Sequence, residues 1–302
     1  MKLINIKGNT YYIRGGTNTG VYKFNDNSVL IIDPGLAGLR PKKLATFLDE
    51  NNLDIKYIIN THEHDDHYGG CNELKKIKDG IKIFAPEDAK FFIEHPDIFG
   101  DYVIGGRGND FLSSKRSKEN DTYIEIDDII QGDEIVLNND KFEIIKLKGH
   151  SRGSIGILTK DKILFVGDLF VGNHILSKFS LLLLNNVKEY LESIEKIKTL
   201  DFKYMVLGHG KETISKEESY KIIENHRKVV YKYINEVRLL LGEKITIDNI
   251  LKQIINNNKL SCNYKEYYFF RSSIVTIISY LVNLDEVNYE IKEGEILYYS
   301  KK

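Results

Sequence analysis

Three apolar, strand-like segments of this chain share one ending: a glycine followed by a side chain that can bind a metal ion. The segments are residues 146–150, 162–168 and 203–209, and their last residues are histidine, aspartate and histidine in that order. Side chains within a strand alternate between the two faces of a sheet, whereas the residue just past a strand lies at the edge of the sheet. Three such endings predict a sheet-based fold with imidazole and carboxylate groups gathered at one rim.

A fourth group of the same residue types follows the predicted strand 56–60, in the segment Thr61-His-Glu-His-Asp-Asp-His-Tyr-Gly-Gly. His62 and His64 are two positions apart, a spacing that in an extended segment lets both rings face one metal ion. Asp66 and His67 are adjacent and point elsewhere, so they suit a second ion. The helical zinc motif His-Glu-x-x-His is excluded, because its fifth position is Asp66 here.

The hydrophobic pattern predicts an α/β (α+β) protein with two sheets and helices outside them. Strand-like runs come in two batches separated by stretches with helical spacing. The predicted strands are residues 28–33, 56–60, 81–85, 134–137, 142–148, 155–159, 162–166 and 203–207, and the predicted helices are residues 41–51, 72–78 and 187–200. The batch from 134 to 166 is expected to be mostly antiparallel. Residues 100–122, rich in glycine and serine, are expected to form a long loop.

The last 90 residues have a different character. Ser215 with Glu218 forms a capping-box pattern that predicts a long helix over 215–241, ended by Gly242. Helix-like stretches at 247–255 and 270–284 and a hairpin pattern over 287–299 follow. Helix, turn, helix and hairpin is a winged-helix pattern. We therefore predict two domains, residues 1–242 and a small winged-helix-like domain, residues 243–302.

Composition excludes several classes of protein. The 302 residues carry 43 Lys and Arg against 44 Asp and Glu, so the chain has no overall positive charge for binding nucleic acid or acidic lipid. Two cysteines are too few for a disulfide scaffold or an all-cysteine metal site. No run approaches the roughly 18 apolar residues that span a bilayer, and the start has no apolar signal-peptide core. The chain is expected to be cytoplasmic, without a membrane anchor.

At this point the chain resembles a known family. Its histidines and aspartates follow the order of the metallo-β-lactamase superfamily, and all five signature motifs are present between residues 1 and about 241. The matching residues are Asp33, His62, His64, Asp66, His67, His150, Asp168 and His209. The resemblance implies an αββα sandwich with a two-metal site on its edge.

The resemblance also implies a role for each residue. The first ion would be held by His62, His64 and His150, the second by Asp66, His67 and His209, with Asp168 bridging both and Asp33 orienting the ligands from the second shell. Imidazole and carboxylate ligands without thiolate suit Zn²⁺ and also tolerate Mn²⁺ or Fe. Two divalent ions would share a hydroxide that attacks a carbonyl carbon or a phosphorus. Asp66 would orient that hydroxide, which makes Asp66 and Asp168 the expected catalytic residues.

Residues that differ from those of particular branches of the superfamily reduce the number of possible activities. Asp168 stands where the antibiotic-destroying branch carries cysteine, and His64 stands where flavodiiron proteins carry glutamate. The glyoxalase II branch shares the ligand set. The segment Asn-His-Arg at 225–227, followed by the winged-helix-like tail, is similar to the β-lactamase-like endoribonucleases.

These features lead to one expected function and two alternatives. We expect a dinuclear-metal hydrolase acting on a small ester, thioester or lactone. The alternatives are an endoribonuclease or phosphodiesterase acting on RNA, and a winged-helix regulator binding nucleic acid or protein with a sensor hydrolase domain. Residues 245–302 carry seven cationic and seven anionic side chains, which disfavours nucleic acid as a partner without excluding RNA. The tail is expected to pack near the long helix and to enclose the site or form a homodimer.

Four further residues with metal-binding side chains fall outside the signature motifs. Cys71 is expected to be a buried small hydrophobic residue. His95, His174 and His226 are expected to be surface or hydrogen-bonded structural residues.

Overall fold

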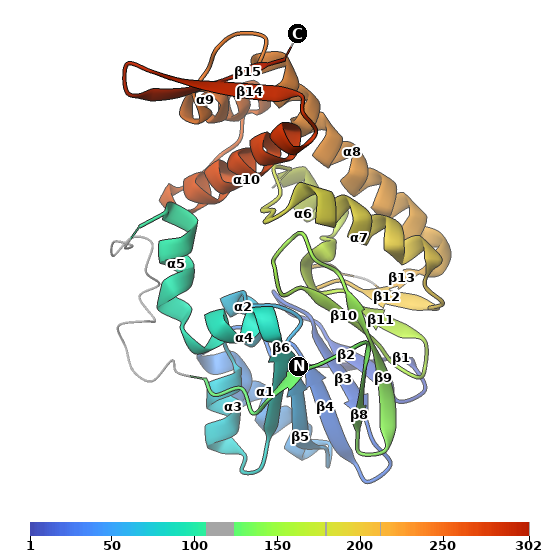
Figure 1. The fold of residues 1–302 in the computed structure, drawn as a ribbon. Helices are drawn as coiled ribbons and strands as arrows, with labels where there is room; N and C mark the ends of the chain where they lie inside the picture. Colours follow the sequence, from blue (N-terminus) through green and yellow to red (C-terminus); the bar gives the residue numbers. More distant parts are fainter. Residues whose placement is uncertain (107–123, 179, 212, 302) are drawn as a thin grey trace.

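Two β-sheets lie face to face, and helices cover the outer face of each (Figure 1). The computed structural model describes residues 1–106, 124–178, 180–211 and 213–301. Three apolar clusters correspond to the layers: one between the sheets and one between each sheet and its helices. The expected αββα sandwich is confirmed.

The first sheet has seven strands in chain order. They are β1 (Leu3–Lys7), β2 (Thr10–Ile13), β3 (Thr19–Lys23), β4 (Ser28–Ile32), β5 (Asp54–Ile59), β6 (Lys82–Pro86) and β7 (Asp128–Ile130). Pairing is antiparallel from β1 to β4 and parallel from β4 to β7. The parallel strands therefore bring their carboxyl ends to one edge of the sheet.

Helices α1 (Leu39–Glu50), α3 (Cys71–Ile77) and α4 (Glu87–Glu94) cover the outer face of the first sheet. Their buried side chains, such as Leu44 and Leu48, pack on strand residues that include Ile31 and Ile58. A single turn, α2 (Asp65–Tyr68), follows β5, and α5 (Pro96–Ile104) follows α4.

The second sheet has six strands in the order β13-β12-β11-β10-β9-β8. They are β8 (Glu134–Leu137), β9 (Asp140–Lys146), β10 (Ile155–Leu158), β11 (Ile163–Phe165), β12 (Tyr204–Val206) and β13 (Ile214–Ser215). The strands β8 to β11 are antiparallel neighbours, as expected, and β12 runs parallel to β11. The 3₁₀ turn η2 (Gly167–Leu169), α6 (Asn173–Lys178) and α7 (Val187–Thr199) lie between β11 and β12.

The core between the two sheets is rich in aromatic residues. Tyr22, Phe24 and Phe142 are fully buried and meet edge to face, with ring centroids 4.9–6.2 Å apart. The Tyr22 hydroxyl donates to Asp140 at the margin of this core. Aromatic residues of this size bury about 150–250 Å² each, so this layer accounts for much of the apolar area that stabilises the sandwich.

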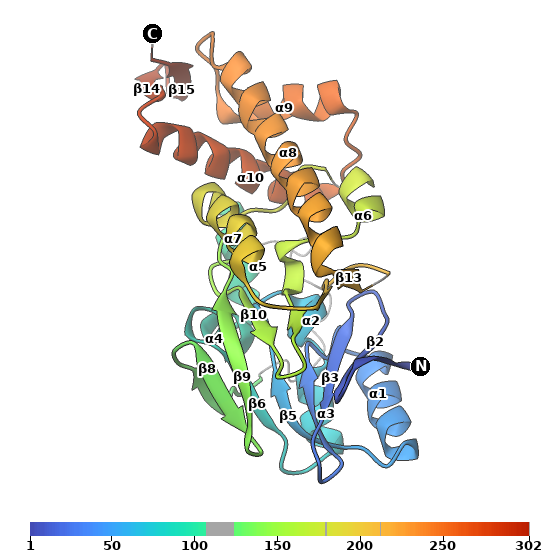
Figure 2. The same ribbon diagram turned by 90° about the vertical axis from the view of Figure 1, so that its right-hand side faces the viewer.

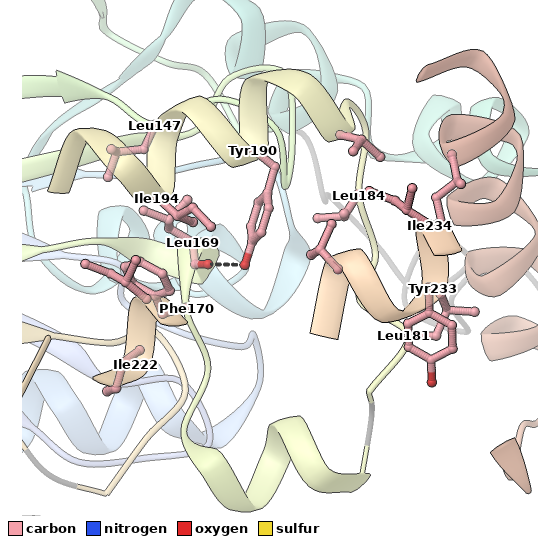
Figure 3. Close-up of a cluster of buried hydrophobic side chains, with 14 of the residues drawn as sticks. Leu147, Leu169, Phe170, Leu181, Leu184, Tyr190, Ile194, Ile222, Tyr233 and Ile234 are labelled. Carbon is pink, nitrogen blue, oxygen red and sulfur yellow. Dashed lines mark hydrogen bonds between the residues drawn. The ribbon is translucent and has the colours of Figure 1, made fainter. Parts of the chain in front are cut away.

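The C-terminal elements pack against the second sheet's helices. They are α8 (Lys216–Leu240), α9 (Ile247–Asn258), α10 (Tyr264–Asn283), β14 (Val287–Lys292) and β15 (Glu295–Ser300). In Figure 2, α8 extends from β13 away from the sheets toward α9 and the hairpin. Apolar residues of α8, α9 and α10 join those of α7 and the second sheet in one cluster, part of which is drawn in Figure 3. The element order of the tail is the expected one, and the winged-helix assignment stays a prediction.

The predicted strands and the three predicted helices of residues 1–207 are found within two residues of their expected bounds. The capping box of Ser215 and Glu218 is formed. The helix expected at 270–284 begins earlier, at Tyr264, because Asn263 and Glu266 form a second capping box. Residues 100–104, expected in the long loop, end helix α5 instead, and residues 107–123 lie outside the described part of the chain. Among the described helices, none has the length and apolar character needed to cross a bilayer.

Candidate metal centre

The seven predicted ligands meet at the edge where the strands end. Four come from the segment after β5, and one each comes from the ends of β9, β11 and β12. They form two groups, in each of which the ligand atoms lie within 4.8 Å of one another: His62, His64, His150 and Asp168 in the first, and Asp66, His67 and His209 in the second.

Asp168 lies between the two groups. Its Oδ1 is 3.2 Å from His67 Nε2, and its Oδ2 is 3.3 Å from His209 Nε2 and 3.8 Å from His150 Nε2. The turn η2 carries this side chain out of the second sheet, and the positive φ of 51° at Gly167 allows the chain to bend there. One carboxylate thus faces both sets of imidazoles.

The segment after β5 changes from extended to helical within a few residues. His64 has extended backbone angles and is the N-cap residue of α2, whose first turn carries Asp66 and His67. The backbone N–H of His67 donates to the His64 carbonyl, which closes this turn. The extended part directs His62 and His64 into the first group, and the turn directs the next ligands into the second.

In four of the five clustered histidines, Nδ1 faces a hydrogen-bond partner elsewhere in the protein. The partners are Thr61 Oγ1 for His62, Asp33 Oδ2 for His67, the Leu183 carbonyl for His150 and the Gly16 carbonyl for His209. These contacts leave Nε2 of each ring toward the cluster. His64 is the exception, because its Nδ1 faces His150 Nε2 at 3.0 Å.

Asp33 connects two strand ends behind the site. Its Oδ1 accepts from the Thr61 N–H at 2.7 Å, and its Oδ2 accepts from Thr61 Oγ1 at 2.6 Å and faces His67 Nδ1 at 2.8 Å. Asp33 has a φ of 55°, and it is 3% exposed. A short polar side chain tolerates this left-handed conformation, so the position lets the carboxylate turn back onto β5 and orient His67.

Unpartnered buried atoms indicate what the cluster can bind. Within the described residues, His62 Nε2, His67 Nε2 and Asp168 Oδ1 are buried and have no hydrogen-bond partner. Buried polar atoms are almost always paired, so three unpaired ligand-type atoms in one cluster are the arrangement that a metal site without its ion would present. Imidazole nitrogens and carboxylate oxygens in two groups fit divalent metal ions.

The protonation of the site differs between its two groups. Burial lowers the pKa of His62 well below 6.5 and that of His64 to about 3, and it also lowers the pKa of His150. Burial opposes protonation of His209 too, but the Asp168 and Asp66 carboxylates raise its pKa to about 10. The first group thus presents neutral imidazoles, the form that binds metals, and the second pairs histidine with carboxylate.

Several contributing residues were not found by sequence reasoning. Thr17 donates from its hydroxyl to Asp66 Oδ2 at 3.1 Å, and Arg40 holds the Thr17 carbonyl. Ser151, next to a ligand, donates to the buried Glu63 carboxylate at 2.8 Å. Phe99 of α5 lies edge-on against the His64 ring. Glu63 and Ser151 are neighbours of ligands and could have been suspected, whereas Thr17, Arg40 and Phe99 had no signal in the sequence.

The four residues expected to be structural behave so. Cys71 is fully buried, donates to Asn60 Oδ1, and has its pKa raised to about 12 by burial. His226 is buried, with one ring nitrogen accepting from the Val171 N–H and the other facing the Ile222 carbonyl. His95 and His174 are exposed.

Gly208 allows the two groups to approach each other. A Cβ here would overlap the Asp168 carboxylate and lie 2.8 Å from His67 Cε1. We expect Gly208→Ala to displace the carboxylate and to weaken metal binding by about 10- to 100-fold. Isothermal titration of the metal-free protein with zinc measures this. Gly210→Ala is the control, because its nearest neighbour would be Leu207 Cδ1 at 3.3 Å. Equal affinities for the two variants would refute the packing argument.

Comparison with known proteins relates this chain to a family and to several hydrolases. The sequence model of the metallo-beta-lactamase superfamily matches residues 12–209. A hydroxyacylglutathione hydrolase of Vibrio vulnificus is 26% identical over 70% of this chain and 69% of its own length. A second, from Aliivibrio salmonicida, is 28% identical over 48% of this chain and 43% of its own length. A probable metallo-hydrolase of Bacillus subtilis is 27% identical over 69% of this chain and 87% of its own.

Two solved structures share the fold over nearly the whole chain. A beta-lactamase domain protein from Burkholderia ambifaria has a TM-score of 0.76 at 16% identity, covering 99% of this chain and 94% of its own. A metallo-beta-lactamase family protein from Thermus thermophilus has a TM-score of 0.73 at 16% identity. The match covers 97% of this chain and 99% of the other. The fold shared with these two proteins therefore includes the C-terminal elements. From the family match and the site together, the chain belongs to the metallo-beta-lactamase superfamily and is a metal-dependent hydrolase of that superfamily.

Proposed function

We propose that this protein is a dinuclear-metal hydrolase of a small ester, thioester or lactone. The observation that carries the proposal is the position of Asp168, whose two oxygens face histidines of both groups at 3.2–3.8 Å. In this proposal His62, His64 and His150 would hold one ion, Asp66, His67 and His209 would hold the other, and Asp168 would be shared between the two.

The ions would supply a hydroxide nucleophile at neutral pH and an electrophilic contact for the substrate oxygen. The protein's own contribution is to orient the reacting groups. The Asp66 side chain is 30% exposed, against 10% for Asp168, so it reaches the open side of the site. Thr17 and His209 contact one of its oxygens, and we propose that this carboxylate orients the attacking hydroxide.

The ligand chemistry supports zinc over other metals. Imidazole nitrogen and carboxylate oxygen without thiolate are usual for catalytic zinc, and the same set tolerates manganese or iron. Cys71, the cysteine nearest to the motif in sequence, is buried and bonded to Asn60, so it adds no sulfur ligand.

Two observations support a small carbonyl substrate over RNA. Two relatives are named hydroxyacylglutathione hydrolase, a name that indicates a small hydroxyacyl compound as their substrate. Residues 245–302 have equal numbers of cationic and anionic side chains, so they lack the excess positive charge that phosphate contacts require. We propose that this tail is a winged-helix-like unit that walls the substrate site.

Metal removal tests the proposal. We expect dialysis against a chelator to abolish hydrolysis of 4-nitrophenyl acetate and of S-acetyl thioesters, and we expect zinc to restore it at two ions per chain. Bis(4-nitrophenyl) phosphate should be cleaved far more slowly by the restored enzyme. Undiminished ester and thioester hydrolysis in metal-free protein would contradict the metal-dependent mechanism, and faster phosphodiester cleavage would favour RNA.

A further inference from the structure

A cavity of about 280 Å³ opens beside the metal centre, on the side of His150 and Asp168. Its wall is almost entirely apolar and comes from parts of the chain far apart in sequence. Residues 181–184, four consecutive leucines, form one side, Ile175 of α6 lies next to them, and Phe269 and Phe270 of α10 contribute from the tail. Figure 3 shows four residues of this wall, Leu169, Leu181, Leu184 and Tyr190.

The polar groups of the wall are bonded within the protein. The Tyr190 hydroxyl donates to the Leu169 carbonyl at 2.9 Å (Figure 3), and both ring nitrogens of His226 have backbone partners. Glu266 accepts from the Asn263 N–H in the capping box of α10. The cavity therefore offers a guest a mostly apolar wall, and His150 and Asp168 of the metal centre are among its lining residues.

Helix α10 also holds the leucine segment in place. Ser273 Oγ donates to the Leu182 carbonyl at 2.8 Å, and Thr276 Oγ1 donates to the Leu184 carbonyl at 3.1 Å. The carbonyl between them, that of Leu183, accepts from His150 Nδ1 at 3.0 Å. The same segment thus forms part of the cavity wall and orients His150, a predicted metal ligand. This shared segment fixes the position of the cavity relative to the metal centre.

We propose that this cavity binds an unbranched aliphatic chain attached to the scissile ester or thioester group, so that the natural substrate is a medium-chain acyl or alkyl compound. The inference rests on the proposed hydrolase function and adds the substrate class. Its physical basis is a mostly apolar wall, which disfavours hydrated groups, while the bond to be cleaved would lie beside His150 and Asp168.

The size of the cavity sets the expected chain length. At about 30 Å³ per water-sized group, a volume of about 280 Å³ corresponds to roughly nine such groups. Each buried methylene should raise kcat/KM about fourfold, equivalent to about 0.8 kcal/mol. The increase should stop when the chain fills the cavity, at about six to nine carbons.

Two substrate series at matched concentrations test the inference and show which side of the bond enters the cavity. The first is 4-nitrophenyl esters with acyl chains of two, four, six, eight and twelve carbons. The second is acetate thioesters of alkane thiols of the same lengths. A rise of about 16-fold per two-carbon step, followed by a plateau, in either series supports the inference. A flat profile in both series overturns it, with the hydrolase function intact.

Variants that alter the wall give opposite expectations. Ile175→Phe reduces the volume, so the plateau should come at a shorter chain. Phe269→Ala enlarges it, so the plateau should come at a longer chain. Tyr268→Ala is the matched control on α10, since Tyr268 is an aromatic neighbour outside the cavity wall. Identical profiles in the three variants and the parent would overturn the assignment of this cavity.

Binding of a neutral alcohol separates this inference from catalysis. We expect 1-octanol to raise the Tm of the metal-free protein and of Tyr268→Ala, and to raise that of Ile175→Phe less. If no substrate of either series is hydrolysed with metal present, the proposed function fails while this binding still tests the cavity. No Tm shift in the parent, together with flat profiles, would overturn the inference.

Discussion

Replacing Asp168 with alanine is expected to reduce the metal content from two ions per chain to one or none and to lower kcat/KM by about 10³-fold or more. The reason is that Asp168 is the carboxylate that lies within 3.2–3.8 Å of ring nitrogens in both groups. Removing it leaves His67 and His209 without their shared partner, and it removes the proposed bridge.

The fold should survive this substitution. Asp168 lies at the rim, and the apolar clusters of the sandwich are built from other residues. Elemental analysis for the metal content and far-UV circular dichroism for the fold are the measurements. Asp201→Ala is the control, because Asp201 is an exposed aspartate that precedes β12 and pairs with Lys162. Two bound ions and normal hydrolysis in Asp168→Ala would disprove the bridging role.

Replacing Asp33 with alanine is expected to affect both stability and metal binding. The Asp33 carboxylate serves three donors on β5 and α2, and its loss leaves the buried Thr61 N–H without an acceptor. Alanine is also strained at a φ of 55°. We expect the free energy of unfolding of the metal-free protein to fall by about 2–4 kcal/mol and zinc affinity to fall by about 10- to 100-fold.

Urea unfolding and zinc titration measure the two effects separately. Asp26→Ala is the matched control, since Asp26 lies at the opposite end of β4 and accepts from Ser28 in an exposed turn. Its loss should cost no more than about 1 kcal/mol and leave zinc affinity unchanged. Asp33→Asn keeps one side-chain oxygen and is tolerated at φ 55°. Its free energy of unfolding and its zinc affinity should lie between those of the parent and of the alanine variant. Unchanged zinc affinity in Asp33→Ala would show that His67 is oriented by other contacts.

Some elements could not be predicted from local pattern. The strands β1 to β3 contain mixed polar and apolar residues, and their pairing with one another and with β4 makes them strands. The end of helix α5, residues 100–104, lies in a region whose glycine and serine content favoured a loop. The beginning of α10 could not be predicted from apolar spacing, because its first turn is tyrosine-rich and exposed. The capping contact of Asn263 determines where the helix begins.

The αββα arrangement was expected from the family resemblance, whereas the sequence by itself indicated two sheets with helices outside them, the positions of most strands, and the set of residues at the rim. These follow from local causes: apolar runs form buried strands, a glycine after a strand permits a turn, and the next side chain then lies at the edge. Only the tertiary structure decided which atoms face the centre, as with Nδ1 of His64 and Nε2 of the other four histidines. It also decided that the tail shares one core with α7 and α8 and walls a cavity beside the site. Those features depend on contacts between residues up to about 190 positions apart, such as His209 with Gly16, and no local pattern encodes which distant backbone carbonyl a ring nitrogen will meet.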